Sequence, residues 1–255
     1  MILNTVEMGE GPPVVLIHGL FGAARNWGAI QKRLAARHRV LAPDLRNHGD
    51  SPRAEGMAHA ATARDLAETL HARGVSRALV VGHSLGGKVA MALALHHPGF
   101  VGRLVVADIA PVRYPPALRG FIAAMRALPL HEGMTRREAD AALAPAVPDA
   151  TIRAFLLQSL DLDASPPRWR LGLAELHAAM PEIEDFREEG RYEGATLAIA
   201  GGRSDYIRPE HRPLFQRLFP AIRFAVIEGA GHWVHAEKPN EFLALVEEFA
   251  AGGAG

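Results

Sequence analysis

The sequence predicts an α/β fold with a mostly parallel sheet and helices on both faces, and three observations lead to this prediction. Short apolar runs alternate with helical stretches over the first 110 residues and again after residue 194. One apolar run leads into the pentapeptide Gly82-His83-Ser84-Leu85-Gly86, and a helix-forming stretch follows it. Between the two alternating regions, residues 112–193 contain helical stretches broken by proline and no apolar β-branched run.

The first region predicts five strands. Residues 1–7 suggest a short strand that the turn-forming residues 9–13 end. Residues 14–17 are continuously apolar, which is typical of a strand buried on both faces. The elements expected after them are a helix at about 26–36, a strand at 39–43, a helix at 58–73, a strand at 78–81, a helix running to about 97 and a strand at 104–108.

Residues 112–193 are expected to form a helical insertion rather than a linker or a repeat. Its helices are expected around 117–127, 136–143, 150–160 and 169–179. Alternation then resumes with a strand at 196–200, a helix at about 210–218, a strand at 223–227, a helix at 239–250 and a frayed tail at 251–255. The expected division is therefore a core of residues 1–111 and 194–255 with the insertion between its two parts.

The composition narrows the classes of function. Lys plus Arg and Asp plus Glu both number 28, so no strong basic field favours nucleic acid or an anionic membrane. The chain has no cysteine, which excludes disulfides, thiolate metal sites and a cysteine nucleophile. No apolar run reaches the roughly 18 residues of a membrane span, and the first residues lack the pattern of a signal peptide. We expect a cytoplasmic monomer or homodimer with no nucleic-acid or membrane partner.

Ser84 is the candidate nucleophile. A strand, a sharp turn and a helix form the context that the Gly-x-Ser-x-Gly signature requires. The turn is expected to strain Ser84 and to present its hydroxyl above the end of the sheet. Side chains at Gly82 and Gly86 would crowd that turn, and the helix N-terminus can stabilise an oxyanion. The alternative interpretation is an ordinary glycine-rich turn.

A serine nucleophile needs a base beside it, and the base needs an orienting carboxylate. The chain contains 13 histidines, so the presence of one proves little. His232 is the best placed, because it follows the last expected strand on a loop between Gly231 and Trp233. Its alternative is a structural role in the loop. His83 is expected to pack beside the sharp turn that holds Ser84, called the elbow below. His235 is expected to support the site or to cap a helix.

Two carboxylates follow strands that lie between Ser84 and His232 in the sequence. Asp108 ends the strand after the serine unit, and Asp205 comes just past the strand at 196–200. Each gives the chain order Ser, Asp, His, and each has the alternative of a turn or helix-cap aspartate.

Two loops nearer the N-terminus are ambiguous. The turn His18-Gly19 can aim a backbone N–H into a site, or it can simply join a strand to a helix. The charged side chains of the loop 44–51 are expected to pair structurally rather than react.

Taken in order, these motifs make the chain resemble the α/β-hydrolases over nearly its whole length. They are His18-Gly19, Asp44–Ser51, Gly82–Gly86, Gly202–Ile207 and Gly229–Trp233. Within that superfamily the chain is similar to the small bacterial YbfF-type esterases, through Gly82–Lys88, Asp108–Pro111 and Gly231–Pro239. The resemblance implies the α/β-hydrolase fold, with residues 112–193 as a helical cap inserted after the sixth strand.

The resemblance also assigns roles within the site. It implies an oxyanion hole made by the backbone N–H groups of Leu20 and Leu85, with Phe21 the less favoured donor. YbfF-type esterases take the carboxylate from the Asp108 position with help from a serine at the Ser204 position, whereas the superfamily at large uses the Asp205 position. We favour Asp108, with Asp205 as a neighbour that tunes the site.

Substrate contacts are expected from both parts of the chain. Phe21, His83 and Trp233 are the candidates in the core. The cap is expected to supply an apolar wall, for which the candidates are Phe121, Met125, Phe155, Leu156 and Trp169. Internal packing of the cap is the alternative for each of these five.

The leading hypothesis is an esterase that forms an acyl-enzyme on Ser84, acts on a small-molecule ester or thioester, and needs no metal or organic cofactor. Rival enzymes are an acyl-CoA thioesterase, a C–C hydrolase and a perhydrolase. Serine at the elbow, where dehalogenases and epoxide hydrolases have aspartate, argues against those two chemistries. From another class, the fold can serve as a ligand-binding receptor without catalysis.

Overall fold

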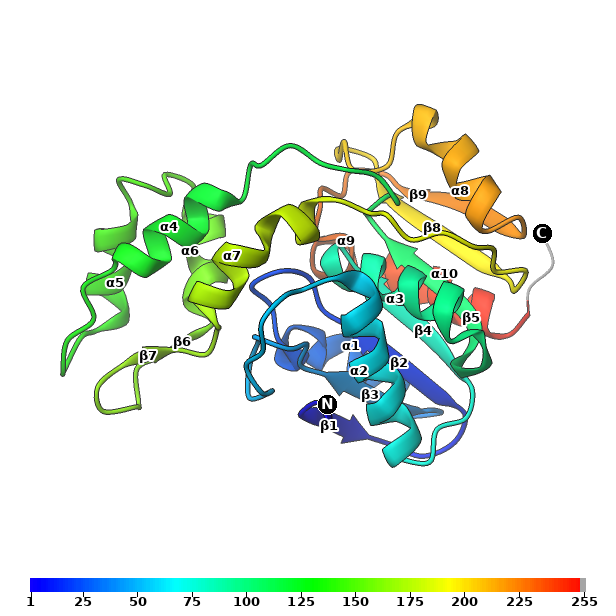
Figure 1. Ribbon diagram of the computed structural model, residues 1–255, viewed down its shortest axis with the longest axis horizontal. Helices are drawn as coiled ribbons and strands as arrows, with labels where there is room; N and C mark the ends of the chain where they lie inside the picture. Colours follow the sequence, from blue (N-terminus) through cyan, green and yellow to red (C-terminus); the bar gives the residue numbers. More distant parts are fainter. Residues whose placement is uncertain (253–255) are drawn as a thin grey trace.

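A seven-stranded sheet runs through the computed structural model, which describes residues 1–252 (Figure 1). Its strands are β1 (Thr5–Met8), β2 (Pro13–Ile17), β3 (Arg39–Pro43), β4 (Ala78–His83), β5 (Val101–Ala107), β8 (Thr196–Gly201) and β9 (Ile222–Ile227). Their spatial order is β1-β3-β2-β4-β5-β8-β9. Only β1 pairs antiparallel with its neighbour, so the expected mostly parallel sheet is confirmed.

Strand β2 shows why the sequence favours a sheet that is covered on both sides. Val15 and Ile17 pack into one hydrophobic cluster, and Val14 and Leu16 pack into another. Successive side chains of a strand point to opposite faces, so a strand with both faces buried must be apolar throughout.

Helices cover both faces of the sheet. One cluster receives side chains from α2 (His59–Ala72), α3 (Leu85–His96) and α8 (Arg212–Leu218), and the other from α1 (Gly28–Leu34), α9 (Val234–Glu237) and α10 (Pro239–Ala250). Figure 1 shows α2 and α3 in front of the strands and α10 behind them. The 3-10 helices are η1 (Ala24–Trp27), η2 (Pro98–Phe100) and η3 (Pro209–His211).

A helical segment gathers at one end of the sheet, on the left in Figure 1. It contains α4 (Arg119–Ala127), α5 (Arg136–Leu143), α6 (Ala150–Leu157) and α7 (Leu173–Glu184). It lies between β5 and β8, so it follows the fifth strand of this chain and not the sixth. Only one strand, β1, precedes the first parallel strand, β2, so β5 is the fifth strand of the chain. The main sheet has seven strands in all.

The expectation that the insertion lacks strands was wrong in one place. Residues Leu160–Asp161 form β6, which pairs antiparallel with β7 (Arg168–Trp169), and α7 begins only at Leu173. The indole N–H of Trp169 donates to the carbonyl of Met125 at 3.0 Å, which ties this small ribbon to α4. Such a long-range contact has no periodicity from which it can be predicted.

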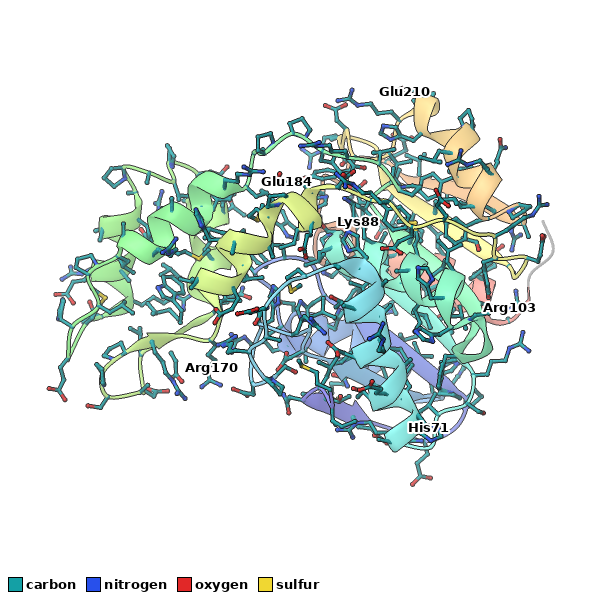
Figure 2. All side chains as sticks on the ribbon, in the orientation of Figure 1. His71, Lys88, Arg103, Arg170, Glu184 and Glu210 are labelled. Atoms are coloured by element: carbon teal, nitrogen blue, oxygen red, sulfur yellow. The ribbon has the colours of Figure 1, made fainter. Side chains whose placement is uncertain are left out.

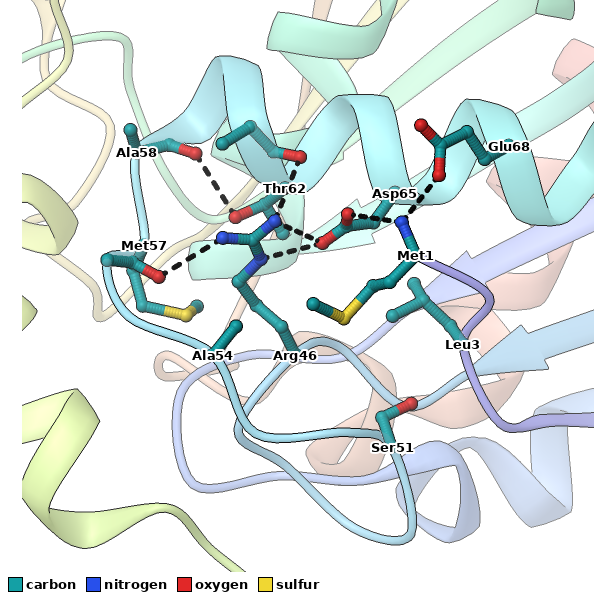
Figure 3. Close-up of polar contacts among 12 residues, drawn as sticks. Met1, Leu3, Arg46, Ser51, Ala54, Met57, Ala58, Thr62, Asp65 and Glu68 are labelled. Atoms are coloured by element: carbon teal, nitrogen blue, oxygen red, sulfur yellow. Dashed lines mark hydrogen bonds and ion pairs between the residues drawn. The ribbon is translucent and has the colours of Figure 1, made fainter.

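A buried ion pair anchors the loop that follows β3 (Figure 3). Arg46 Nε donates to Asp65 Oδ2 of α2 at 2.6 Å, and its other nitrogens reach backbone carbonyls of residues 55, 56 and 61. Asp44 accepts hydrogen bonds from the backbone N–H groups of Ala24 and Asp50. Asp44 and Arg46 therefore have structural partners, and the third charged side chain of the loop, Asp50, pairs with Arg170 at 3.3 Å.

Two further observations concern the helices and the C-terminus. Within residues 1–252, no helix combines the length and the apolar character that crossing a bilayer requires. Helix α10 ends at Ala250, and the last three residues of the expected frayed tail lie outside the described residues.

Candidate active site

Ser84 occupies a sharp turn between β4 and α3. Its backbone has φ of 53° and ψ of −121°, a conformation that costs a non-glycine residue about 1–3 kcal/mol. The surrounding glycines make the turn possible. A Cβ on Gly82 would lie 2.2 Å from the Gly86 carbonyl oxygen, and one on Gly86 would lie 2.3 Å from that of Ile17. This is the strained strand-to-helix elbow that the motif predicts.

We expect Gly86→Ala to destabilise the fold by at least about 2 kcal/mol, because the new methyl group would meet backbone atoms that cannot move aside. The free energy of unfolding from a denaturant titration measures this. Gly99→Ala is the matched control, since a Cβ there meets nothing within 4 Å. Equal stability of the two variants would show that the elbow is not as tight as described.

His232 and Asp108 are joined directly. The His232 Nδ1–H donates to Asp108 Oδ2 at 2.8 Å, which leaves Nε2 of the neutral ring as an acceptor. Asp108 is fully buried and also accepts from the backbone N–H of Gly201 at 3.0 Å and from the Ser204 hydroxyl. Its own φ of 49° lies in the left-handed region. The carboxylate is thus held by three donors that fix its orientation.

Asp205 does not contact His232, although the sequence made it a candidate catalytic residue. Its side chain is exposed and, within residues 1–252, makes no hydrogen bond or ion pair. The turn after β8 explains the difference: the Ser204 hydroxyl points inward to Asp108 and accepts from the N–H of Tyr206 at 3.3 Å. The next side chain along the chain is thereby left on the outside.

Ser84 and His232 face one cavity of about 210 Å³. The Ser84 hydroxyl is half-buried and makes no hydrogen bond to another residue in the described part of the chain. The ring of Tyr206 stacks on that of His232, with centroids 4.0 Å apart. The other lining residues are His18, Gly19, Leu20, Phe21, Gly22, Asn26, His83, Leu118, Phe121, Ile152, Phe155, Leu156, Trp233 and His235.

Two buried histidines fix the loop that follows β2. His18 Nε2 accepts from the N–H of Leu45 at 3.0 Å, and His48 Nε2 accepts from that of Phe21 at 3.3 Å. Burial lowers the pKa of His18 and lowers that of His48 to about 3, so both rings stay neutral and can accept. The N–H of Phe21 is therefore occupied. Within residues 1–252 the N–H groups of Leu20 and Leu85 donate to no acceptor.

Known proteins resemble this chain in both sequence and fold. The family model described as "Alpha/beta hydrolase family" matches residues 14–245. This chain belongs to the alpha/beta hydrolase family. It is 41% identical to the mouse protein "sn-1-specific diacylglycerol lipase ABHD11", over 94% of this chain and 81% of the relative. It is 37% identical to the Escherichia coli "Esterase YbfF", over 93% of this chain and 92% of the relative. A solved structure, "Marine microorganism esterase", superposes with a TM-score of 0.94 at 32% identity and covers 97% of this chain and 99% of that one.

In this alpha/beta hydrolase His83 packs against the loop that carries His232. Its Nε2–H donates to the carbonyl of His232 at 2.8 Å, and its ring centroid lies 4.7 Å from that of His232 and 4.6 Å from that of His235. Burial lowers the pKa of His83 well below its ordinary value, so the ring is a neutral donor. His83 therefore packs beside the turn that holds Ser84, as the sequence predicts.

Three of the five wall residues expected from the hydrolase's helical segment do line the cavity, namely Phe121, Phe155 and Leu156. Met125 and Trp169 do not. Met125 is fully buried inside the segment, and Trp169 packs on the same α4. The three core candidates for substrate contact, Phe21, His83 and Trp233, all line the cavity, and the Trp233 ring lies 5.5 Å from that of Phe155.

Sequence reasoning missed several lining residues. Ile152 shares a helix face with Phe155 and Leu156, at i+3 and i+4 spacing, and Leu118 stands three residues before Phe121. That spacing was the available signal for both. Tyr206 had none beyond its place in a matched loop, because its stacking on His232 depends on the turn after β8.

Proposed function

We propose that this chain is a carboxylesterase-type serine hydrolase that cleaves small-molecule carboxylic esters through an acyl-enzyme on Ser84. The observation that carries the proposal is the hydrogen bond from His232 to the buried Asp108, because the His232 ring lines the same apolar cavity as a serine held in a strained elbow. The names of the relatives, which include an esterase and a diacylglycerol lipase, support the same reaction class.

The proposed reaction starts with proton transfer. The Ser84 hydroxyl attacks the acyl carbonyl while His232 Nε2 takes its proton, and Asp108 stabilises the resulting imidazolium without becoming protonated. His232 then returns the proton to the departing alcohol, and the acyl group stays on Ser84 Oγ. Water attacks this acyl-enzyme with His232 again as base, which releases the acid and restores the serine.

The developing oxyanion is assigned to the N–H groups of Leu20 and Leu85. Both groups lack an acceptor in the described chain, whereas the N–H of Phe21 is engaged by His48. Donors that are fixed before the substrate arrives need no reorganisation when charge develops, and losing one typically costs about 10²–10³-fold in rate. The neutral state of His48 matters here, because a protonated ring would release the loop that carries Leu20.

Residues 112–193 are proposed to act as a cap that supplies the apolar wall of the cavity, and the remaining residues as the core. Phe121, Phe155 and Leu156 support this, since they line the same cavity as Phe21 and Trp233. We also propose a cytoplasmic monomer or homodimer without a nucleic-acid partner, in keeping with equal numbers of acidic and basic residues.

We expect kcat/KM for ester hydrolysis to rise with pH through the neutral range. A histidine base must lose its proton before it can accept one, and imidazole ordinarily does so near neutrality. The other cavity histidines stay neutral there, because burial lowers the pKa of His18 and His83 and lowers that of His235 to about 3. A profile that is flat from about pH 5 to 9, measured on folded protein, would contradict a histidine base.

A substrate panel tests the reaction class. It contains p-nitrophenyl esters of increasing acyl length, a diacylglycerol and acyl-CoA thioesters, and each is assayed with the parent and with Ser84→Ala. Serine-dependent hydrolysis of the esters supports the proposal. Turnover of thioesters alone would make the protein a thioesterase. If the protein binds these compounds but neither turns them over nor reacts with a fluorophosphonate, it is a receptor.

A further inference from the structure

Lys88 stands one helical turn after Ser84, inside the protein. Its side chain is 2% exposed, and its backbone N–H donates to the Ser84 carbonyl at 3.1 Å. It is one of only three lysines in the chain. A lysine is almost never fully buried unless its ammonium group is paired, so its surroundings require an explanation.

The ammonium group is held by the end of α7. Nζ donates to the backbone carbonyls of Ile183, Glu184 and Asp185, at 3.2, 2.9 and 2.8 Å. Ile183 and Glu184 end α7 and Asp185 follows it, so these carbonyls lie where intrahelical donors run out and a cation is favourable. Figure 2 labels Lys88 close to Glu184, between α7 and the core.

No carboxylate in the described chain pairs with Lys88. The side chain of Glu184 pairs with Arg119, and that of Asp185 pairs with Arg187. All three N–H bonds of the ammonium group are therefore used by backbone carbonyls. With all three donors engaged, the ammonium group has no hydrogen bond left to offer a substrate.

The chain passes between the core and the helical segment twice, and the stretch that enters the segment also contacts the Lys88 ammonium group. Tyr114 lies on the chain entering the segment, and its N–H donates to the Glu184 carbonyl at 2.9 Å. Nζ of Lys88 lies 5.1 Å from the centre of the Tyr114 ring, within the range of a cation–π contact. Tyr114, before the first helix of the segment, and residues 183–185, at the end of its last helix, thus both contact Lys88 on the helix that begins after Ser84.

Tyr114 connects this point to the histidine. Its hydroxyl donates to the carbonyl of Tyr206 and accepts from the N–H of Ala110 at 2.8 Å. The ring of Tyr206 stacks on that of His232. A small cavity of about 50 Å³ lies among Leu20, Ser84, Leu85, Lys88, Ile109, Tyr114, Pro115, Ala117, Leu118, Met180, Ile183, Glu184 and Tyr206.

We propose that Lys88 is a positioning residue that fastens both crossings of residues 112–193 to the nucleophile helix and, through Tyr114 and Tyr206, holds the His232 ring in register with Ser84. This inference rests on the proposed function, because it needs Ser84 and His232 to react together.

The first test compares Lys88→Met with Lys32→Met, a control on the exposed side of α1. Methionine is an unbranched side chain only one atom shorter than lysine, and it has none of the three donors. With p-nitrophenyl butyrate, and active sites counted by fluorophosphonate titration, Lys88→Met should lower kcat by about ten- to a hundredfold with a smaller change in KM. Amide hydrogen exchange should quicken at residues 112–116 and 183–187. The control should match the parent.

The second test uses Tyr114→Phe, which keeps the ring beside Nζ but removes the hydroxyl that reaches Tyr206. It should lower kcat, and the double variant should lose no more than Lys88→Met alone, because both changes break one connection. Multiplied losses would show two independent effects and overturn the inference.

Two further outcomes would also overturn it. One is a folded Lys88→Met with kcat within about twofold of the parent, since a positioning role predicts at least tenfold. The other, decisive if Lys88→Met does not fold, is an unchanged kcat in Tyr114→Phe. A parent that neither hydrolyses esters nor reacts with the fluorophosphonate would instead overturn the proposed function, whereas an active parent with unaffected variants overturns this inference alone.

Discussion

Replacing Ser84 with alanine should lower kcat for ester hydrolysis by about 10³–10⁴-fold or more while the protein stays folded. The change removes one half-buried hydroxyl that makes no hydrogen bond within residues 1–252, so the free energy of unfolding should move little. The covalent route disappears with the hydroxyl, and only the oxyanion donors and substrate binding remain. Steady-state kinetics and a denaturant titration measure the two effects.

Ser76→Ala is the matched control, because that serine is exposed in the loop before β4, at the other end of the same strand. It should keep full activity. Retention by Ser84→Ala of more than about a hundredth of the parent kcat would exclude Ser84 as the nucleophile, since triad deletions cost far more.

Exchanging the two candidate carboxylates for amides should separate them clearly. Asp108→Asn should lower kcat by about 10⁴-fold, because an amide in place of the carboxylate favours the wrong tautomer of His232. Asp205→Asn should cost much less, since that side chain is exposed and touches no part of the pair. The measurement is kcat/KM of both variants with one ester substrate, after circular dichroism has shown that both are folded.

A larger loss in Asp205→Asn than in Asp108→Asn would contradict this assignment. Equal small losses would mean that neither carboxylate orients His232. The Ser204 hydroxyl and the Gly201 N–H also bind Asp108, so Asp108→Asn should lower stability as well, whereas Asp205→Asn should not.

The core of the fold could be predicted because its signals are local. The run at residues 14–17 is apolar at every position, which requires a strand covered on both faces, and β2 has this environment. The elbow was equally local, since Gly82, Ser84 and Gly86 stand between a β-branched run and a helix former. The ends of the parallel strands then place His18, Asp44, Ser84, Asp108 and His232 at one edge of the sheet.

Other features depend on contacts that no local pattern records. The choice between Asp108 and Asp205 rests on a left-handed φ at Asp108 and on a turn that points Ser204 inward. The ribbon of β6 and β7 depends on pairing across a loop, and it removes Trp169 from the cavity wall.

Lys88 illustrates both cases. Its place four residues after the serine was visible in the motif, but its three carbonyl partners come from nearly a hundred residues away. No pattern in the sequence near Lys88 or near these carbonyls predicts the contact. The connection between the helical segment and the helix after Ser84 is therefore visible only in the folded structure.

The most direct test of the central claim is mass spectrometry of the parent protein after reaction with a fluorophosphonate. The account predicts one adduct per chain, located on the peptide that contains Ser84, and no adduct in Ser84→Ala. It also predicts that Asp108→Asn slows the labelling, because the reagent needs the same activated hydroxyl as the substrate. An adduct on a different residue, or no adduct on folded protein, would contradict the claim that Ser84 is the nucleophile.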